Sequence, residues 1–506
     1  MQKRLLALVL VFLVLVDSAR ATWSIVVVNH RTGEVCVAAA TCIGNFDLKP
    51  ALCVIRVGEG GAAAQSVIDS SGMNRLAIWN ELQNGTAPND IITLLGTQDS
   101  LHQRRQYGIV SVRGAPATFT GTQCSAARFG VSGTTGDLSY SIQGNILTGT
   151  IVVTNAEAAF LSSSGDLPTR VMAGMLAARA MGGDGRCSCS ALMPTSCGAP
   201  PANFTQADST AFLVSSRLGD VDGTCINGQN CANGTYWCDL REISSAGGFD
   251  PVLRLASDTI PEWRFVVGER ADHFLTRVTS SSARIPADGT SAATVDVELR
   301  NLEDQPVSPL LASLEVVAAD SPAVAAASAP TDLGGGRLRF TLASNGQLGT
   351  TRYWITVVHQ SGVRVRLWPA LELEAVAPAP ILLGREVVSA SAGASVPVWL
   401  DLGATRAGSM HLVLGTSSGT APGSTFQGVH LPLNRDRFLN ASYLRTLGGP
   451  FVGTAGVLDA NGRAVARFEP PPGWLAPFIG RRLDWAAYVS GGPAIATNAV
   501  GLDVGP

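Results

Sequence analysis

The sequence has little charge and no cluster of basic residues. Charged residues make up 15% of its 506 residues, against about 25% in an average soluble domain, and the formal net charge is -3 at pH 7. Domains that bind nucleic acids usually carry a basic patch that neutralises phosphates. The composition therefore argues against a nucleic-acid partner. With 46% hydrophobic residues and 55 glycines, the chain is long and apolar enough for several folded domains.

Long hydrophobic runs are missing after the first 21 residues. No later stretch reaches the 18 or so uncharged apolar residues that a membrane-spanning helix needs. The one apolar run, Leu5–Val16, is too short to span a bilayer, and Ala19-Arg20-Ala21 follows it with the spacing of a signal-peptidase site. We predict that residues 1–21 are a cleavable signal peptide. The mature protein would be secreted, would begin at Thr22 and would have no integral membrane segment.

Cysteine is absent after Cys238, so cross-links can form only in the front half of the chain. An even number of cysteines, ten, favours disulfides in an exported protein, although the sequence does not fix their pairing. A zinc site is the alternative, but the cysteine-rich stretch contains no Cys-x-x-Cys pair and no histidine. Such a site would have to use Cys187, Cys189, Cys197, Cys225, Cys231 and Cys238.

Common metal and cofactor motifs are also missing. The six histidines show no His-Glu-x-x-His spacing, and no Gly-x-Gly-x-x-Gly follows the first predicted strand. Asp220–Gly223 is similar to the start of a calcium loop but lacks the later ligand positions, so we predict a disulfide-tied surface loop there. We therefore expect neither a metal nor a cofactor.

Strand and helix patterns alternate over residues 22–258. Periodicity and turn residues predict strands at 23–28, 35–40, 107–112, 117–120 and 138–142. Helices are predicted at 74–83, 89–95 (with Asn89 as the N-cap), 155–161 and 168–181. The order of strands, two helices, strands, two helices and strands predicts an α+β domain with two sheets between helix layers, and disfavours a doubly wound parallel sheet.

Short strands with period-two alternation fill the back half. Residues 274–372 have the pattern of a β-sandwich, with alternating runs at 294–299, 337–342 and 363–367. The stretch 285–307 resembles bacterial immunoglobulin-like modules of the invasin type. Residues 375–380 are predicted to be a stiff Pro/Ala linker, and residues 381–506 a second all-β domain.

Thr22 is the residue with the clearest catalytic potential. Cleavage after Ala21 would place its hydroxyl beside a free α-amine, which can act as a general base without a histidine. A strand predicted to begin at Trp23 would hold this end of the chain in place. Position alone is weak support, because Ser, Thr or Cys would stand there by chance in about one exported protein in six.

An ordered set of short motifs between Thr22 and about Leu255 resembles the domain-of-unknown-function 1028 (DUF1028) family. The resemblance implies an αββα sandwich like that of the N-terminal nucleophile (Ntn) hydrolases, in which a Thr or Ser opens the first strand. The family brings no established substrate. The motifs are Thr22-Trp23-Ser24-Ile25-Val26, Thr32-Gly33-Glu34, Ala62-Ala63-Ala64-Gln65-Ser66, Arg105-Gln106-Tyr107-Gly108-Ile109-Val110, Phe119-Thr120-Gly121, Gln143-Gly144-Asn145-Ile146-Leu147 and Gly182-Gly183-Asp184.

This resemblance suggests three catalytic residues. Thr22 falls at the nucleophile position, Thr41 where such folds often place a polar group near the nucleophile, and Asn145 where its side chain could help to hold an oxyanion. The alternatives are that Thr41 is structural and that Asn145 forms a turn. Proteasome-like members of the class add a lysine, a role that Lys49 or Arg56 would have to fill, although Lys49 is predicted to lie in a loop.

Two functions are compatible with these observations. The first is an exported Ntn-type hydrolase that cleaves an amide bond, peptide or related, with Thr22 as nucleophile. The alternative is a non-catalytic secreted protein that uses the Ntn-like domain as a scaffold to bind a cell-surface or matrix ligand. The N-terminus of the secreted protein and covalent labelling of Thr22 distinguish the two.

Overall fold

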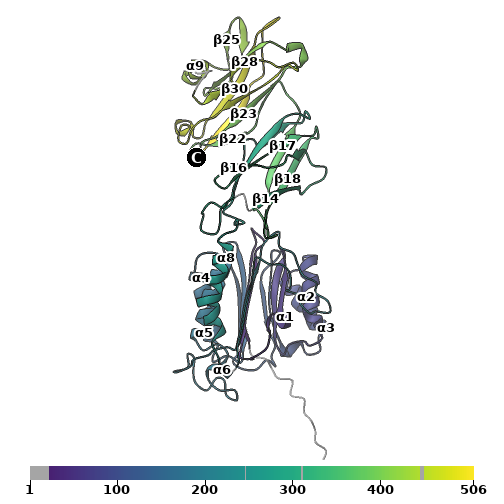
Figure 1. The fold of residues 1–506 in the computed structure, drawn as a ribbon, viewed down its shortest axis with the longest axis vertical. Coiled ribbons are helices and arrows are strands. Elements are labelled where there is room, and N and C mark those ends of the chain that lie inside the picture. Colours follow the sequence, from purple (N-terminus) through teal and green to yellow (C-terminus); the bar gives the residue numbers. More distant parts are fainter. Residues whose placement is uncertain (1–21, 246, 309–311, 445–448) are drawn as a thin grey trace, which may run out of the picture. The chain divides into compact units, whose positions relative to one another are not determined.

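The chain divides into two compact units, one ending at Val267 and the other beginning at Gly268 (Figure 1). A computed structural model describes residues 22–245, 247–308, 312–444 and 449–506. The predicted signal peptide lies outside the described residues. In the described part of the chain, no helix is long and apolar enough to cross a membrane.

The larger sheet of the first unit has six antiparallel strands in the order β10-β9-β2-β1-β8-β7. Its central strands β1 and β2, at the positions of the first two predicted strands, form a hairpin whose turn contains Gly33 at φ +70°. Residues of β1 and β2 are buried on both faces, as expected for strands inside a layered domain. The strands are β1 (Thr22–Asn29), β2 (Val35–Thr41), β7 (Phe129–Thr135), β8 (Leu138–Asn145), β9 (Thr210–Ser216) and β10 (Cys238–Ile243).

A second, four-stranded antiparallel sheet packs face to face against the first. Its order is β3-β4-β5-β6, and the apolar core between the sheets includes Val26, Val37, Ala63 and Val110. Toward the start of β1 this inner layer becomes polar, and the candidate site lies there. The strands are β3 (Cys53–Arg56), β4 (Gly60–Ser66), β5 (Arg105–Ser111) and β6 (Ala117–Thr120).

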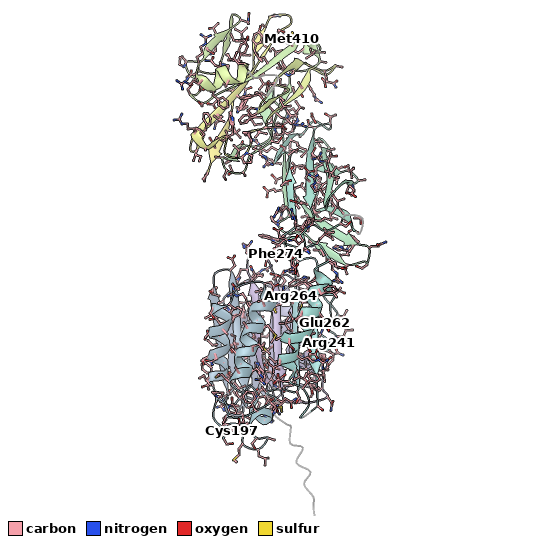
Figure 2. All side chains as sticks on the ribbon, turned by 60° about the vertical axis from the view of Figure 1, so that its left-hand side comes forward. Cys197, Arg241, Glu262, Arg264, Phe274 and Met410 are labelled. Carbon is pink, nitrogen blue, oxygen red and sulfur yellow. A yellow bond between two sulfur atoms is a disulfide. The ribbon has the colours of Figure 1, made fainter. Side chains whose placement is uncertain are left out.

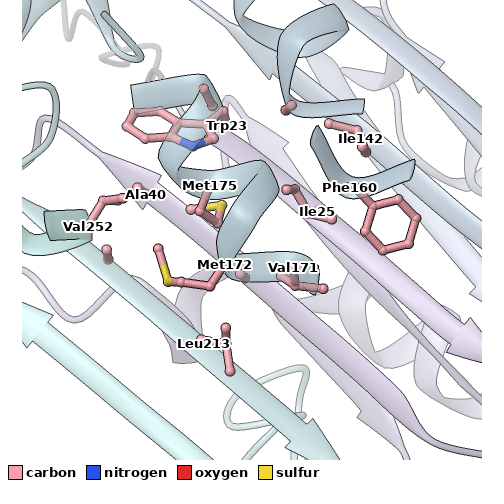
Figure 3. Packing of buried hydrophobic residues seen from close by; sticks show 14 of the residues in the cluster. Trp23, Ile25, Ala40, Ile142, Phe160, Val171, Met172, Met175, Leu213 and Val252 are labelled. Carbon is pink, nitrogen blue, oxygen red and sulfur yellow. The ribbon is translucent and has the colours of Figure 1, made fainter. Parts of the chain in front are cut away.

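Helices cover the outer face of each sheet (Figure 1). On the six-stranded sheet, Met172 and Met175 of α5 pack over Trp23 and Ile25 of β1 (Figure 3), and on the four-stranded sheet α2 and α3 contact β3 to β6. The first unit therefore has the layer order helix, sheet, sheet, helix. The longer helices are α2 (Met73–Asn84), α3 (Pro88–Gln98), α4 (Ile151–Ser162), α5 (Leu167–Ala180) and α8 (Ile260–Val267). The short ones are α1 (Lys49–Leu52), α6 (Gly185–Ser188) and α7 (Pro251–Arg254), with a π-helical turn at Leu255–Thr259.

The predicted start of α3 is wrong. Asn89 lies inside the helix, because Pro88 occupies the first turn and Ala87 is the N-cap. Proline suits that position, since its fixed φ is helical and it needs no N–H partner there. For α5, Asp166 caps the helix by accepting a hydrogen bond from Thr169 N.

Three disulfides cross-link the first unit: Cys42–Cys187, Cys189–Cys197 and Cys225–Cys231. Disulfides persist in oxidising compartments, so they fit an extracellular location. In Figure 2, Cys197 lies at the end of the unit opposite Arg264 of α8. Four cysteines remain as buried thiols, namely Cys36, Cys53, Cys124 and Cys238.

The second unit begins with a β-sandwich around its own core, which includes Val295, Phe340 and Ile355. One sheet has the order β11-β13-β17-β15 with β16 beside β17, and the other β12-β20-β18-β14 with β19 beside β18. The predicted linker starts too early, because Ala375 and Val376 are the end of β20. The strands are β11 (Arg277–Ser280), β12 (Arg284–Pro286), β13 (Ala292–Glu298), β14 (Ala312–Ala318), β15 (Ala325–Ala327), β16 (Thr331–Gly334), β17 (Arg337–Ser344), β18 (Gly349–His359), β19 (Arg364–Arg366) and β20 (Leu371–Val376).

A second sandwich follows, with sheets ordered β21-β23-β29-β27 and β22-β32-β30-β24-β28 and a separate β25-β26 hairpin. The prediction that this region is all β is wrong in one place, because α9 (Arg437–Leu444) packs Phe438 into its core, and Asp436 accepts a hydrogen bond from Leu439 N at its start. The strands are β21 (Ile381–Leu383), β22 (Val387–Ser389), β23 (Val396–Asp401), β24 (Met410–Thr416), β25 (Ser424–Phe426), β26 (Val429–Leu431), β27 (Phe451–Val452), β28 (Ala455–Val457), β29 (Arg463–Phe468), β30 (Arg482–Val489), β31 (Ile495–Ala496) and β32 (Val500–Gly505).

Candidate active site

Thr22 opens β1 with its side chain in the layer between the two sheets. Side chains alternate along a strand; Trp23 and Ile25 pack in the core beneath the helices, whereas Ser24 bonds to the facing sheet and Val26 packs in the core between the sheets. Thr22 therefore faces the other sheet. It is fully buried, and its Oγ1 has no hydrogen-bond partner in the described part of the chain.

Asn145 lies directly opposite Thr22, at the end of the neighbouring strand β8. It is also fully buried, and neither its Oδ1 nor its Nδ2 has a hydrogen-bond partner among the residues that the structure describes. The next residue, Ile146, has φ +55°, a conformation that is a clear outlier for a β-branched residue. Backbone strain of this kind is concentrated at functional sites.

Thr41 lies on the other side of Thr22. Continuing the β1–β2 register by one pair sets the two threonines opposite each other, which places their Cβ atoms about 5 Å apart on the same face. Arg186 Nη2 donates to Thr41 Oγ1 over 3.4 Å, and Ser209 N donates to the Thr41 carbonyl over 2.7 Å. Thr22 thus has Asn145 on one side and Thr41 on the other.

Asp184 organises the segment that supplies Arg186. Its carboxylate is fully buried and accepts hydrogen bonds from Cys42 N at 2.7 Å, Arg186 N at 3.0 Å and Arg186 Nη2 at 2.8 Å. The Cys42–Cys187 disulfide ties the same segment to the end of β2. Two independent links therefore hold Arg186 next to Thr41.

A chain of buried amides supports the site from the facing sheet. Gln65 Nε2 donates to the Thr22 carbonyl at 3.1 Å and to Gln106 Oε1 at 2.9 Å. Gln65 Oε1 accepts from Ser24 Oγ at 2.6 Å, and Ser24 in turn accepts from Gln143 Nε2 at 2.5 Å. Gly108 makes room for this chain, since a Cβ there would lie 2.1 Å from the Gln143 Oε1 atom. The network connects the two sheets and fixes the backbone of Thr22.

A buried carboxyl pair lies behind the site. Asp208 precedes the residue that bonds to Thr41, and its Oδ2 accepts a hydrogen bond from Val252 N at 3.2 Å. Burial raises the pKa of Asp208, and the neighbouring Asp250 raises it further. Asp250 is held by Arg179 Nε at 3.1 Å.

The structure brings Thr22, Thr41 and Asn145 together at one end of the inner layer. It does not bring the cationic candidates there. Lys49 is buried in α1, not in a loop as predicted, and its Nζ lies 2.6 Å from Asp239 on β10, three strands from β1. Arg56 lies at the far end of β4 from Gln65, where it pairs with Asp222 and stacks on Trp79.

The sequence motifs contain Gln65, Gln143 and Asp184, but no supporting role was assigned to them, and Arg186 was not predicted at all. The pattern of β8 could have indicated Gln143. Polar side chains alternate with apolar ones along this strand, and every position of the strand is buried. In a strand with both faces covered, such a polar face must bond to another layer. The alternating polar residues are Ser139, Ser141, Gln143 and Asn145.

No group of three or more His, Cys, Asp or Glu residues in the described part of the chain could hold a metal ion. The loop that is similar to a calcium loop is tied by Cys225–Cys231. In it, the Asp220 carboxylate accepts hydrogen bonds from Arg217 N and Trp237 N, each at 2.8 Å. Burial raises the pKa of Asp220 to about 6. The Asp220 Oδ2 atom thus accepts two hydrogen bonds from backbone N–H groups.

A family model described as a family of unknown function (DUF1028) matches residues 22–208. No curated protein matches the sequence. Among solved structures, the chain is similar to protein SPO2555 from Silicibacter pomeroyi, described with the same family, at 20% identity and a TM-score of 0.35, covering 48% of this chain and 88% of that chain.

Two bacterial adhesins also show similarity. The adhesin InvE of Yersinia pseudotuberculosis is 16% identical with a TM-score of 0.18, covering 45% of this chain and 58% of that chain. The Escherichia coli adhesin FdeC is 11% identical with a TM-score of 0.19, covering 79% of this chain and 92% of that chain. The DUF1028 model thus matches part of the mixed α/β unit, residues 22–208, and two β-sandwiches follow that unit.

Proposed function

We propose that this chain is an exported hydrolase of amide bonds, with Thr22 of its DUF1028 domain as the nucleophile. The observation that carries the proposal is the pair formed by Thr22 and Asn145, two fully buried polar side chains that lie opposite each other on β1 and β8. Thr22 Oγ1 and both polar atoms of Asn145 lack hydrogen-bond partners in the described part of the chain. An unpaired buried polar group costs about 1–3 kcal/mol, a cost that is understandable where a substrate completes the bonds.

The layer order of the first unit supports the finer assignment to an Ntn-hydrolase-like fold. In that fold the nucleophile opens a strand inside the two-sheet layer, and Thr22 occupies this position in β1. The sequence motifs support this assignment through their resemblance to the class. The position of Thr22 between the sheets supports it independently of those motifs.

Cleavage after Ala21 would convert the Thr22 nitrogen from an amide into an amine, the general base of this chemistry. The amine takes the Oγ1 proton as the hydroxyl attacks the amide carbonyl of the substrate, and the proton passes to the leaving nitrogen as the C–N bond breaks. Water then hydrolyses the ester on Thr22, with the same amine accepting the water proton and returning it to Oγ1. The Asn145 amide would donate a hydrogen bond to the oxyanion in both steps.

Two measurements on the secreted protein test this function. Amino-terminal sequencing should begin at Thr22, and a different first residue would rule out Thr22 as an N-terminal nucleophile. An electrophilic probe for N-terminal threonine should then add its mass to the wild type and to Thr22→Ser, which keeps a hydroxyl, but not to Thr22→Ala. Absence of labelling in a protein that begins at Thr22 would favour the alternative, a binding scaffold for a cell-surface or matrix ligand.

A further inference from the structure

The segment that precedes β9 connects two parts of the candidate site. The Ala207 carbonyl accepts a hydrogen bond from Asp184 N at 3.2 Å, and Ser209 N donates to the Thr41 carbonyl at 2.7 Å. Asp208 lies between these two contacts and has no exposed surface. The contacts that hold Asp208 therefore also position Asp184 and Thr41.

Asp208 and Asp250 form a buried carboxyl pair with unequal hydrogen bonding. The Asp250 carboxylate accepts bonds from two backbone N–H groups, at 2.9 and 3.1 Å, and from Arg179 Nε at 3.1 Å. Asp208 Oδ2 accepts one from Val252 N at 3.2 Å, and Asp208 Oδ1 has no donor in the described part of the chain. Accepted hydrogen bonds favour the ionised form of a carboxyl group. A proton shared by the pair therefore belongs on Asp208.

The charges around the pair also favour one proton. Burial raises the pKa of Asp208, Asp250 raises it further, and Arg179 lowers it. With both carboxyls ionised, one arginine would face two buried carboxylates, and neither carboxylate could donate to the other. A single proton removes the excess charge and supplies the missing donor. The acidic residues before α6 and on β10 have cationic partners of their own, which are Arg186 for Asp184, Lys49 for Asp239 and Arg254 for Glu242.

We propose that Asp208 and Asp250 share one proton at neutral pH, and that the hydrogen bond between them holds the segment before β9 in place. The pair joins this segment to the start of α7, where Asp250 is the N-cap and Val252 N bonds to Asp208. Loss of the proton would set two carboxylates against each other and weaken the contacts of the segment. Asp208 and Asp250 are then positioning residues for Thr41 and Asp184, and the segment loosens as the pH rises.

Infrared spectroscopy of the full chain beginning at residue 22 tests the shared proton. A protonated carboxyl absorbs apart from carboxylates, and we expect such a band in the wild type at pH 8 that Asp208→Asn removes. Asp220→Asn is the matched control and should keep the band, because Asp220, with a pKa of about 6, is already ionised at this pH. Absence of the band in the wild type, or its persistence in Asp208→Asn, would overturn the shared proton.

The pH dependence of stability tests its effect on the fold. Folding raises the pKa of Asp208, so the contribution of Asp208 to stability is complete at low pH and is lost as the pH rises. Asparagine still accepts from Val252 N and can donate to Asp250 at every pH. The urea midpoint of Asp208→Asn should therefore increase relative to the wild type between pH 6 and 9, whereas Asp208→Leu, which can do neither, should be less stable throughout. A constant difference between Asp208→Asn and the wild type would contradict the proposal.

Hydrogen exchange tests whether the pair holds the segment. In the wild type, protection of the Asp184 and Ser209 amides, corrected for the intrinsic exchange rate, should fall about 10-fold between pH 6 and 9, the effect of one lost hydrogen bond. Protection should stay constant in Asp208→Asn, and at Val26 in the middle of β1 in both proteins. Equal pH profiles of the two amides in wild type and Asp208→Asn would show that the pair does not position them. None of these measurements requires turnover, so their outcome is independent of the proposed hydrolase.

Discussion

At the scale of single residues, the inner layer contains two kinds of buried polar side chain. Gln65, Gln143 and Ser24 satisfy one another through hydrogen bonds, whereas Thr22 Oγ1 and the Asn145 amide have no partners among the described residues. Satisfied buried networks stabilise and rigidify a fold, but an unpaired polar group destabilises it. We therefore assign a supporting role to the hydrogen-bonded residues, and a catalytic role to Thr22 and Asn145.

Asn145 and Gln143 should therefore respond in opposite ways to apolar replacement. Asn145→Leu, of similar shape, removes an unpaired amide and should raise the free energy of unfolding by about 1 kcal/mol while abolishing activity. Gln143→Met, on the same strand, removes the hydrogen bond that Ser24 accepts and the one that Ser141 donates, and should lower the free energy of unfolding by about 1–3 kcal/mol. Urea unfolding measures both. A destabilised Asn145→Leu protein would mean that the amide is structurally bonded.

Asp220 predicts a pH dependence of stability. Its folded pKa of about 6 lies above the unfolded value of about 3.9, so the folded state binds the proton more tightly. The contribution of Asp220 to stability is complete below pH 4 and is lost as the pH rises through about 6, an effect of about 3 kcal/mol. Asp220→Asn, which can still accept both backbone N–H groups, should remove this slope in urea unfolding between pH 4 and 7. The exposed Asp258→Asn should leave it unchanged, and an identical slope in both variants would contradict the prediction.

At the scale of elements, local sequence predicted most helices and strands of the first unit, although it placed the start of α3 wrongly, and it did not predict contacts between elements. The helix α5 was predictable because Asp166 and Gly182 mark its ends within the local sequence. The helix α9 was missed because it lies among strands, and its core contact through Phe438 is tertiary. The bond from Gln65 to Thr22 depends on how two sheets stack, which no single strand encodes.

The N-cap of α5 also connects two helices. Asp166 accepts a hydrogen bond from Thr169 N at 2.9 Å and pairs with Arg264 of α8 at 2.8 Å. Asp166→Ala should lower the free energy of unfolding by about 1–2 kcal/mol, because it removes the cap together with a partly buried ion pair. Arg264→Gln removes the ion pair alone and should cost less, as measured by urea unfolding. Equal losses in the two variants would show that the cap contributes nothing.

At the scale of the whole molecule, the two units are stabilised in different ways. The first has three disulfides and separate cores on each side of its two sheets. The second has apolar sandwich cores and no cysteine in its sequence. The DUF1028 domain occupies the cross-linked unit, and the Cys42–Cys187 bond closes on the segment that carries Arg186. Formation of the Cys42–Cys187 disulfide therefore helps to hold the residues of the candidate site in place.

The last prediction concerns cross-linking and the unfolding of the full chain. Calorimetry should resolve two transitions, and a reductant should lower the temperature of only one, because every disulfide lies in the first unit. Replacing both members of Cys42–Cys187 by serine should cost that unit about 5 kcal/mol, since the bond closes a loop of sequence separation 145. The same change at Cys189–Cys197, separation 8, should cost about 2 kcal/mol. A shift of both transitions on reduction would show that the units unfold together.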